Sequence, residues 1–502
     1  MVCMDTKEKM RLLGGVDLGK QTAEDEGDQL ENYFVETQYW ESVYNGETDL
    51  VLAPKGGGKS AINSMLLRKK DVFRVRNILL VEGENPAGDP AFLELNNASE
   101  LTNADLERIW KVYFLAMTIR ELDNRYIHDE RIATVKKLLA DANIPFSLTT
   151  PRKTIVSRIL DYIPKITFEG SLADPTGFVH TGKITFREPS NEEAEKGFVS
   201  LDSLFEKVNA VLKDNQVSIW ILLDRLDAAF TAYADVELKA LQALIRVYLY
   251  LKSYEAISLL LFLRTDIWED IGRGGFTELS RINSDKVIKW DRSALMDLIV
   301  KRLLANGDVV RSYGTTADEV LKTYAARENF LEKIFPKQIG AGDKQSKTFD
   351  WVLKRLEDGK GAVSPRDLIY FFQQLFDIQV EQIEKGITDF AGGEIVSRKV
   401  FKEAFSDTSR NRVTKTLFAE YPDLRPKIER LSGRKAQQDR ATLAEIWDQS
   451  ESESEDVARE LVRVGFFREK RSSKVTTTTY EVPFLYRPAL DIKAGKQWAQ
   501  SV

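Results

Sequence analysis

The sequence is poor in the residues that build disulfides and zinc sites. Its 502 residues include one cysteine, Cys3, and two histidines, His128 and His180. A single cysteine excludes an internal disulfide framework, and so few cysteines and histidines exclude a zinc site made from them. Two histidines in so long a chain also disfavour Ser-His-Asp or Cys-His catalysis, and no G-x-S-x-G motif occurs. The chemistry has to be sought in other residue types.

Long apolar runs and an excess of positive charge are also missing. No stretch approaches the ~18 apolar residues that a membrane helix needs, and the first residues lack the apolar run of a signal peptide. The net charge is −6 and the pI is near 5.5, so no overall field draws the chain onto DNA or an anionic membrane. We expect a cytoplasmic, soluble protein without membrane contact, in which any DNA binding is local.

What the sequence does have is enough apolar material for several cores. Hydrophobic residues make up 43% of the chain, so two to four domains are expected. The first twenty or so residues are polar and should be frayed, whereas residues 28–46 have helical spacing. Apolar strands then alternate with helices, which predicts a parallel sheet covered on both faces. Residues 103–122 predict a long core helix with Asn103 as its N-cap, and the polar, proline-broken residues 124–200 predict an insertion.

One short stretch carries the strongest functional signal: "DLVLAPKGGGKSAINSML", residues 49–66. We call residues 53–60 the phosphate loop, because a loop between a strand and a helix N-terminus presents backbone N–H groups to phosphate. Lys59 would reach the terminal phosphates of a nucleotide and Ser60 would give its hydroxyl to Mg²⁺. Ala53 replaces the usual first glycine at a strand end, where a small residue is enough. The expected nucleotide-binding residues are Gly56, Gly57, Gly58, Lys59, Ser60 and Ala61; a glycine-rich turn without a ligand is the alternative.

Two further strands end in polar residues that suit such a site. "SIWILLDRLDAAF" places Asp224 after an apolar run, as a carboxylate for Mg²⁺; Arg225 follows, so Asp227 is the candidate for orienting the attacking water. "ISLLLFLRTD" ends in Arg264 and Thr265, either of which could sense a γ-phosphate, since parallel strands deliver their carboxyl ends to one crevice. A plain ion pair from Arg264 to Asp266 or Asp285 is an equal alternative.

The sequence becomes purely helical after residue 290. "SPRDLIYF" places Arg366 in the first turn of an amphipathic helix, from which it could reach a nucleotide. A salt bridge to Asp367 or Glu357 is the alternative.

The last hundred residues change character again. The helix "SEDVARELVRVGFF" runs into "REKRSSKVTTTTYEVP", a hairpin signal with a basic turn, and this combination predicts a winged helix. Its hairpin could meet a DNA backbone through Arg468, Lys470, Arg471 and Lys474, with Trp447 and Tyr480 interleaved among basic residues. The acidic "DQSESESEDV" just before it favours a protein contact instead.

Taken together, "APKGGGKS", "LLDRLD", "FLRTDIWEDI" and "SPRDLIYF" resemble a bacterial AAA+/STAND-type ATPase with an origin-recognition-like layout. The resemblance implies an α/β fold: a parallel-sheet P-loop NTPase (AAA+-like) core, an all-α lid and a C-terminal winged-helix domain. It implies ATP and Mg²⁺ as cofactors, with Lys59 and Ser60 in the Walker A role and Asp224 in the Walker B role. Thr265 or Arg264 would be sensor 1, and Arg366 sensor 2.

The expected division is residues 1–48 as a helical lead-in, 49–290 as the ATPase core, 291–390 as the lid and 391–502 as the winged-helix-like domain. The function that the resemblance implies is a slow ATP-hydrolysing switch or assembly ATPase, in DNA transactions or defence against phage. It would act as a homo-oligomer or on an effector chain. The alternative is an ATP-regulated protein that binds DNA through residues 391–502.

Overall fold

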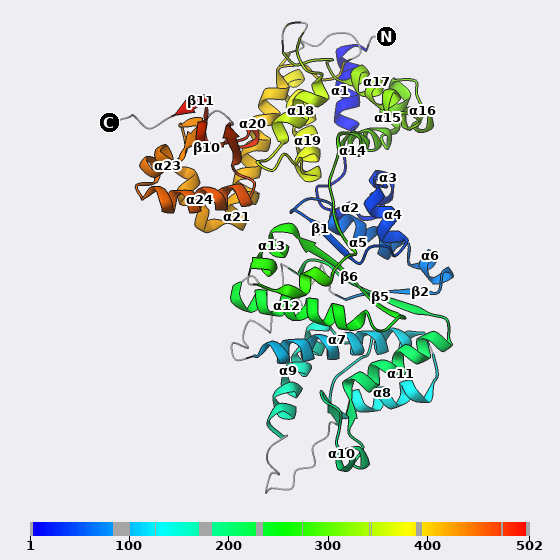
Figure 1. Cartoon of the computed structure of the whole chain (residues 1–502). Helices are drawn as coiled ribbons and strands as arrows, with labels where there is room; N and C mark the ends of the chain where they lie inside the picture. Colours follow the sequence, from blue (N-terminus) through cyan, green and yellow to red (C-terminus); the bar gives the residue numbers. More distant parts are fainter. Residues whose placement is uncertain are drawn as a thin grey trace. The chain divides into compact units, whose positions relative to one another are not determined.

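The computed structural model describes residues 4–83, 101–125, 127–169, 183–226, 234–273, 275–340, 342, 344–387, 394–472 and 475–497 (Figure 1). The chain forms two compact units. The sheet unit comprises Gln38–Pro54 and Lys59–Ile288, and the helical unit comprises Met1–Thr37, Lys55–Gly58 and Lys289–Val502. Lys55–Gly58 of the phosphate loop thus belong to the helical unit. The four-part division expected from the sequence stays a prediction.

Five parallel strands form the sheet of the sheet unit, in the order β2-β5-β6-β1-β7. Strands covered on both faces have to be apolar throughout, and β1 and β6 are buried along almost their whole length. The predicted parallel sheet is confirmed. β6 lies between the strand before the phosphate loop, β1, and the strand before Asp224, β5. The strands are β1 (Leu50–Ala53), β2 (Ile78–Glu82), β5 (Ser218–Leu223), β6 (Ile257–Arg264) and β7 (Asp285–Val287).

The longest helix of the sheet unit is buried on nearly all its faces from Ile109 to Leu122, where the sequence spacing predicts a single apolar stripe. The long core helix is present, but its N-cap is Thr102 instead of Asn103. Thr102 and Asp105 form a reciprocal capping box, which fixes the helix start one residue earlier. The helices are α4 (Gln38–Tyr44), α5 (Lys59–Arg68), α6 (Lys70–Val75), α7 (Asn103–Asn124), α11 (Leu201–Asp214), α12 (Ala234–Leu251) and α13 (Thr265–Arg273), with a 3₁₀ turn η4 (Thr277–Arg281).

The region predicted as an insertion contains regular structure where it is described. Arg152, at the start of α9, donates from Nη2 to the carbonyl of Glu82 at 2.7 Å, so this region is tied to the carboxyl end of β2. Its elements are α8 (Glu130–Asp141), α9 (Arg152–Glu169), β3 (Ile184–Thr185), α10 (Asn191–Glu195) and β4 (Val199–Ser200).

The helical unit has its own core, rich in aromatic side chains. Phe335, Phe371, Phe372, Phe376 and Phe401 contact one another around the middle of α19. Its first helices are α14 (Arg292–Leu304), α15 (Gly307–Ser312), α16 (Ala317–Leu321), α17 (Tyr324–Ile334), α18 (Thr348–Leu356), α19 (Pro365–Glu384) and α20 (Val400–Arg412). No helix among the described residues has the length and apolarity to cross a membrane.

The N-terminal residues belong to this core, and the expectation that they are frayed is wrong from residue 4 onward. Helix α1 (Thr6–Gly15) starts with a capping box between Asp5 and Glu8 and buries Leu12 and Leu13. The helix expected over residues 28–46 is broken. It becomes the end of η1 (Gly27–Gln29), α3 (Leu30–Tyr33) and α4, because Phe34 and Val35 are buried in an extended segment; α2 (Ala23–Glu26) precedes it.

The C-terminal part is a winged helix, as predicted. Strands β9 and β10 form an antiparallel hairpin, and the sheet order is β11-β8-β10-β9. Its elements are η5 (Val413–Leu417, a π-helix), α21 (Phe418–Glu420), η6 (Pro422–Leu424), α22 (Arg425–Glu429), β8 (Lys435–Asp439), α23 (Arg440–Trp447), α24 (Glu451–Arg463), β9 (Arg468–Ser472), β10 (Val475–Glu481), η7 (Phe484–Tyr486) and β11 (Lys493–Gln497).

Candidate functional site

The phosphate loop has the predicted local structure. β1 ends at Ala53 and α5 begins at Lys59. Gly56 and Gly58 have φ values of 74° and 97°, in the left-handed region that side chains disfavour. The backbone therefore curls between strand and helix, and the first N–H groups of the ten-residue helix α5 close the curl.

Three side chains of the helical unit fill the space that the glycines leave. Trp290 donates its Nε1–H to the carbonyl of Gly57 at 2.9 Å, and a Cβ on Gly58 would lie 3.3 Å from the Trp290 ring. A Cβ on Gly56 would lie 2.8 Å from Ser364 Oγ and 3.2 Å from Arg366 Cβ. The glycines are thus needed for close contact as well as for backbone conformation.

The lysines of the loop have different partners. Lys59 Nζ donates to the carbonyls of Ala53 at 2.9 Å and Pro54 at 3.3 Å, so it lies along the loop's own backbone. Lys55 Nζ forms an ion pair with Glu420 Oε1 at 2.7 Å. Ser60 and Ala61 are in the first turn of α5.

Asp224 follows β5 directly and is only 4% exposed. Its Oδ1 accepts the N–H of Arg225 at 2.9 Å, and Arg225 has a φ of 59°, which is uncommon for a side chain of this size. A strained backbone beside a buried acid is typical of functional sites. Asp227, the candidate for orienting water, lies outside the described residues.

Arg264 and Thr265 stand at the end of β6, next to the strand that leads into the loop. Ala53 pairs in register with Arg264. Arg264 forms a two-pronged ion pair with Asp266, with Nε–Oδ1 and Nη2–Oδ2 distances of 3.0 and 2.6 Å. The structure thus forms the ion pair that was the alternative to a sensing role. Thr265 is the first residue of α13.

Arg366 occupies the predicted first turn of α19, after Ser364 at the N-cap and Pro365 at the first helical position. Its Nε is buried and has no hydrogen-bond partner among the residues that the structure describes. Neither expected acid takes it in an ion pair: Asp367 pairs with Arg412 at 3.1 Å, and Glu357 pairs with Arg468 at 3.2 Å. A buried, unpaired donor beside the phosphate loop suits an anion.

Burial shifts the pKa of Asp367, the residue next to Arg366, and opposes the rise in the pKa of its partner Arg412. Asp367 is 3% exposed; burial raises the pKa of its carboxyl, and the Arg412 and Arg366 guanidiniums oppose the rise. Burial alone would lower the pKa of Arg412, but Asp367, Tyr486 and Asp358 keep that pKa above its ordinary range. This buried pair holds the start of α19, and with it Arg366, in place.

These features fit a nucleotide with a magnesium ion. In the helical unit the left-handed glycines and the buried Arg366 Nε favour phosphate oxygens, and in the sheet unit the N-terminus of α5 does so. Lys59 would contact the phosphates, and Ser60 and Asp224 offer the oxygen ligands that Mg²⁺ prefers. No group of three or more His, Cys, Asp or Glu side chains gathers as a metal site in the described part of the chain.

The sequence analysis missed Trp290, Ser364 and Glu420. Each contacts the loop but stands far from it along the chain, and nothing in a single sequence marks such contacts. Only Ser364 had a local signal, as the residue before Pro365 at a helix start.

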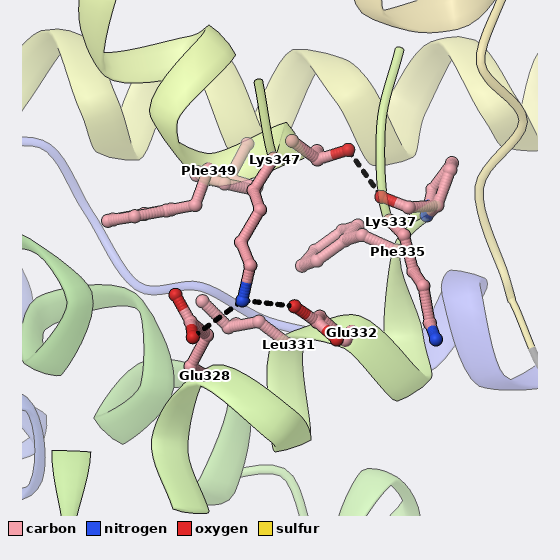
Figure 2. Close-up of a pocket in the computed structure, with 10 residues that line it drawn as sticks. Glu328, Leu331, Glu332, Phe335, Lys337, Lys347 and Phe349 are labelled. Atoms are coloured by element: carbon pink, nitrogen blue, oxygen red, sulfur yellow. Dashed lines mark hydrogen bonds and ion pairs between the residues drawn. The ribbon is translucent and has the colours of Figure 1, made fainter. Parts of the chain in front are cut away.

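A small apolar pocket lies within the helical unit (Figure 2). Its floor is apolar, from residues such as Leu331, Phe335 and Phe349, and Lys347 spans its rim with ion pairs to Glu328 at 2.7 Å and Glu332 at 2.9 Å. The cavity measures about 20 Å³, room for a single water. It is too small for a nucleotide.

The winged helix buries the two aromatic residues that were expected on its surface. Trp447 and Tyr480 are 1% and 3% exposed, so the prediction that they interleave with a DNA-facing surface is wrong. Arg468 pairs with Glu357, and Lys470 pairs with Glu481. The side chain of Arg471 and the whole of Lys474 lie outside the described residues.

Comparisons with known proteins give the following. No protein-family model matches the chain, and no curated protein matches it. Among solved structures it is similar to the Aeropyrum pernix ORC1 protein in complex with DNA, at 11% identity over 94% of this chain and 96% of that one, with a TM-score of 0.35.

Two more solved structures show the same low level of similarity. The Aeropyrum pernix ORC2 protein in ADPNP–ADP complexes has 11% identity, 90% and 91% coverage and a TM-score of 0.29. Drosophila ORC bound to DNA has 10% identity, 97% and 92% coverage and a TM-score of 0.25. TM-scores this low carry no argument about fold or function, so the description of the fold rests on the parallel sheet and the phosphate loop of this chain.

Proposed function

We propose that this chain is an ATP-binding switch that hydrolyses ATP slowly. One observation carries the proposal. The side chain of Arg366 lies against Gly56 of the phosphate loop, in which Gly56 and Gly58 are left-handed, and the buried Arg366 Nε has no hydrogen-bond partner among the described residues. Bound Mg–ATP supplies the negative charge that such donors require and a phosphoanhydride bond that water can cleave.

The residues of the chain then have distinct roles. Lys59 and the loop backbone bind phosphate, Ser60 and Asp224 hold the metal ion, and Arg366 senses the terminal phosphate. Asp227 orients the water. Since Arg264 is paired with Asp266, Thr265 is the better sensor 1 candidate. With one carboxylate at the strand end and Arg225 next to it, slow turnover is expected, as suits a switch whose nucleotide state sets its assembly.

Nucleotide binding and size in solution test the proposal. Titration of a fluorescent ATP analogue should show binding by wild type and a loss of more than about 100-fold in affinity for Lys59→Ala, which removes the ammonium that we propose contacts the phosphates. Arg68→Ala, exposed at the other end of α5, is the matched control. Asp227→Ala should bind ATP and stay in the ATP-bound assembly, measured by light scattering. Wild type that takes up no nucleotide would refute the proposal.

A second candidate is ATP-regulated DNA contact, because residues 435–481 form a winged helix with a basic hairpin. The surface of α24 opposes it: Glu451, Glu453 and Asp456 are exposed there. The salt dependence of DNA binding by the full chain decides, since each neutralised phosphate contributes about 0.9 to the slope of log K against log[salt]. A slope near zero with and without ATP removes this candidate. No described feature is specific to defence against phage, and we do not propose that role.

A further inference from the structure

The phosphate loop is held by an acid from the C-terminal part of the helical unit. Glu420, the last residue of α21, makes the 2.7 Å ion pair with Lys55, which directly precedes the three glycines. The Glu420 side chain is 9% exposed and the Lys55 side chain 38% exposed. A carboxylate this buried keeps a fixed position, so the pair ties the loop to α21.

The segment that carries Glu420 is irregular. Helix α20 ends at Arg412, and residues 413–424, the irregular segment, pass from a π-helix (Val413–Leu417) through α21 to a 3₁₀ turn (Pro422–Leu424). π-helical stretches are rare and occur often at functional sites, because their hydrogen bonding is easily rearranged. The segment leads directly into α22 and β8 of the winged helix.

Charge makes this contact sensitive to what the loop binds. Glu420 is close enough to the start of α19 that its charge adds to the rise in the pKa of Asp367, which burial dominates. A terminal phosphate at the loop would place a second strong negative charge near Lys55, and one ammonium cannot fully neutralise both. A diphosphate, which ends earlier, competes less.

We propose that Glu420 is a switch residue: it ties the irregular segment to the phosphate loop through Lys55, and the terminal phosphate of a nucleoside triphosphate displaces it. This inference deepens the proposed function and rests on it. Displacement frees residues 413–424 and so passes the nucleotide state to the winged helix. The loop between α18 and α19 makes a second connection to the winged helix, because Gly359 donates its N–H to the carbonyl of Gly465 at 2.7 Å.

Hydrogen–deuterium exchange of the full chain tests the switch. A non-hydrolysable ATP analogue should speed exchange of the amides in residues 413–424 about tenfold in wild type, and ADP less than twofold. Glu420→Gln, nearly isosteric, should show fast exchange without nucleotide. It should also bind the analogue about tenfold more tightly than wild type, with ADP affinity changed less than twofold. Glu429→Gln, an exposed acid on α22 paired with Arg425, is the matched control and should behave as wild type.

A second variant guards against a folding defect in Glu420→Gln. Lys55→Met alters the exposed partner and should also speed exchange of residues 413–424 without nucleotide, with an unchanged circular dichroism spectrum. If the analogue binds wild type but leaves this segment's exchange unchanged, or if Glu420→Gln gains no preference for triphosphate, the switch is overturned while the proposed function stands. If wild type binds no nucleotide, both fail.

Discussion

Basic side chains near the phosphate loop differ in kind from those on the outer surface of the helical unit. At the loop, the Arg366 Nε is buried without a hydrogen-bond partner among the described residues, and Arg412 is buried against Asp367. On α24, Arg459 is 67% exposed and pairs with Asp456 and with Glu455, which also pairs with Arg440. Buried cations need one fixed partner, whereas exposed ones exchange partners with water at little cost. The two groups of basic residues therefore differ in what their replacement should cost.

The largest expected effect comes from replacing the buried arginine. Arg412→Met leaves the Asp367 carboxylate buried without its cation, which should lower the free energy of unfolding by about 3–5 kcal/mol. Arg459→Met on the exposed helix should cost less than about 0.5 kcal/mol. Urea unfolding of the full chain measures both.

The double variant Arg412→Met with Asp367→Leu checks the cause. Removing both charges together should recover most of the loss, since well-packed apolar residues can replace a buried ion pair at little cost. If Arg412→Met and Arg459→Met lower the free energy of unfolding equally, the buried and the exposed arginine do not differ in their contribution to stability.

The next largest effect concerns the loop backbone. Gly56→Ala forces a side chain into a left-handed conformation and within 2.8 Å of Ser364 Oγ. The expected loss in the free energy of unfolding is about 2–4 kcal/mol, from backbone strain and crowding together. Gly386 has a similar φ of 78° but open space around it, so Gly386→Ala should show only the backbone part, about 1 kcal/mol. Thermal unfolding compares the two, and an equal cost would show that Ser364 moves aside freely.

The same comparison shows what a sequence can reveal. The phosphate loop was predictable because strand, glycines and Lys-Ser are adjacent along the chain, and the sheet because its strands are apolar throughout. Arg366 was placed correctly by Ser364 and Pro365 at a helix start. These are local signals, and local signals survive folding when no tertiary contact opposes them.

What could not be predicted depends on distant contacts. Trp290 and Glu420 reach the loop from other parts of the chain, and neither has a pattern of its own. The burial of an aromatic residue also cannot be predicted from its charged sequence neighbours, since Trp447 and Tyr480 lie among basic residues in the sequence yet are buried in the core. The N-terminal helix was predicted wrongly, although Asp5 and Glu8 have the spacing of a capping box, which the sequence shows. The surface that buries Leu12 and Leu13 could not be predicted from the sequence.

A third prediction isolates the sensing role of Arg366. Arg366→Ala should weaken binding of a non-hydrolysable ATP analogue by about tenfold, or 1.4 kcal/mol, and ADP binding by less than threefold. Arg366→Lys should recover part of the loss, because lysine keeps the charge but not the fork of donors. Calorimetric titration with each nucleotide gives the ratio. Equal losses for both nucleotides would assign Arg366 to general phosphate binding, without discrimination of the terminal phosphate.

The smallest expected effect belongs to the ion pairs at the rim of the apolar pocket, which are among the more exposed pairs of the helical unit. The hydrogen bond from Lys347 lowers the pKa of Glu328 below its usual 4.5, and Arg292 adds to the effect. A carboxyl whose pKa is lower in the folded state stabilises the fold above its unfolded pKa, and this stability is lost as the pH falls through the folded pKa. Glu328→Gln should therefore cost under about 1 kcal/mol at pH 7 and less near pH 3. Thermal unfolding at the two pH values measures the difference, with Glu384→Gln, exposed at the end of α19, as the control. A cost that is large, or that persists in acid, would show that surface pairs in this unit hold the fold as firmly as the buried pair behind Arg366.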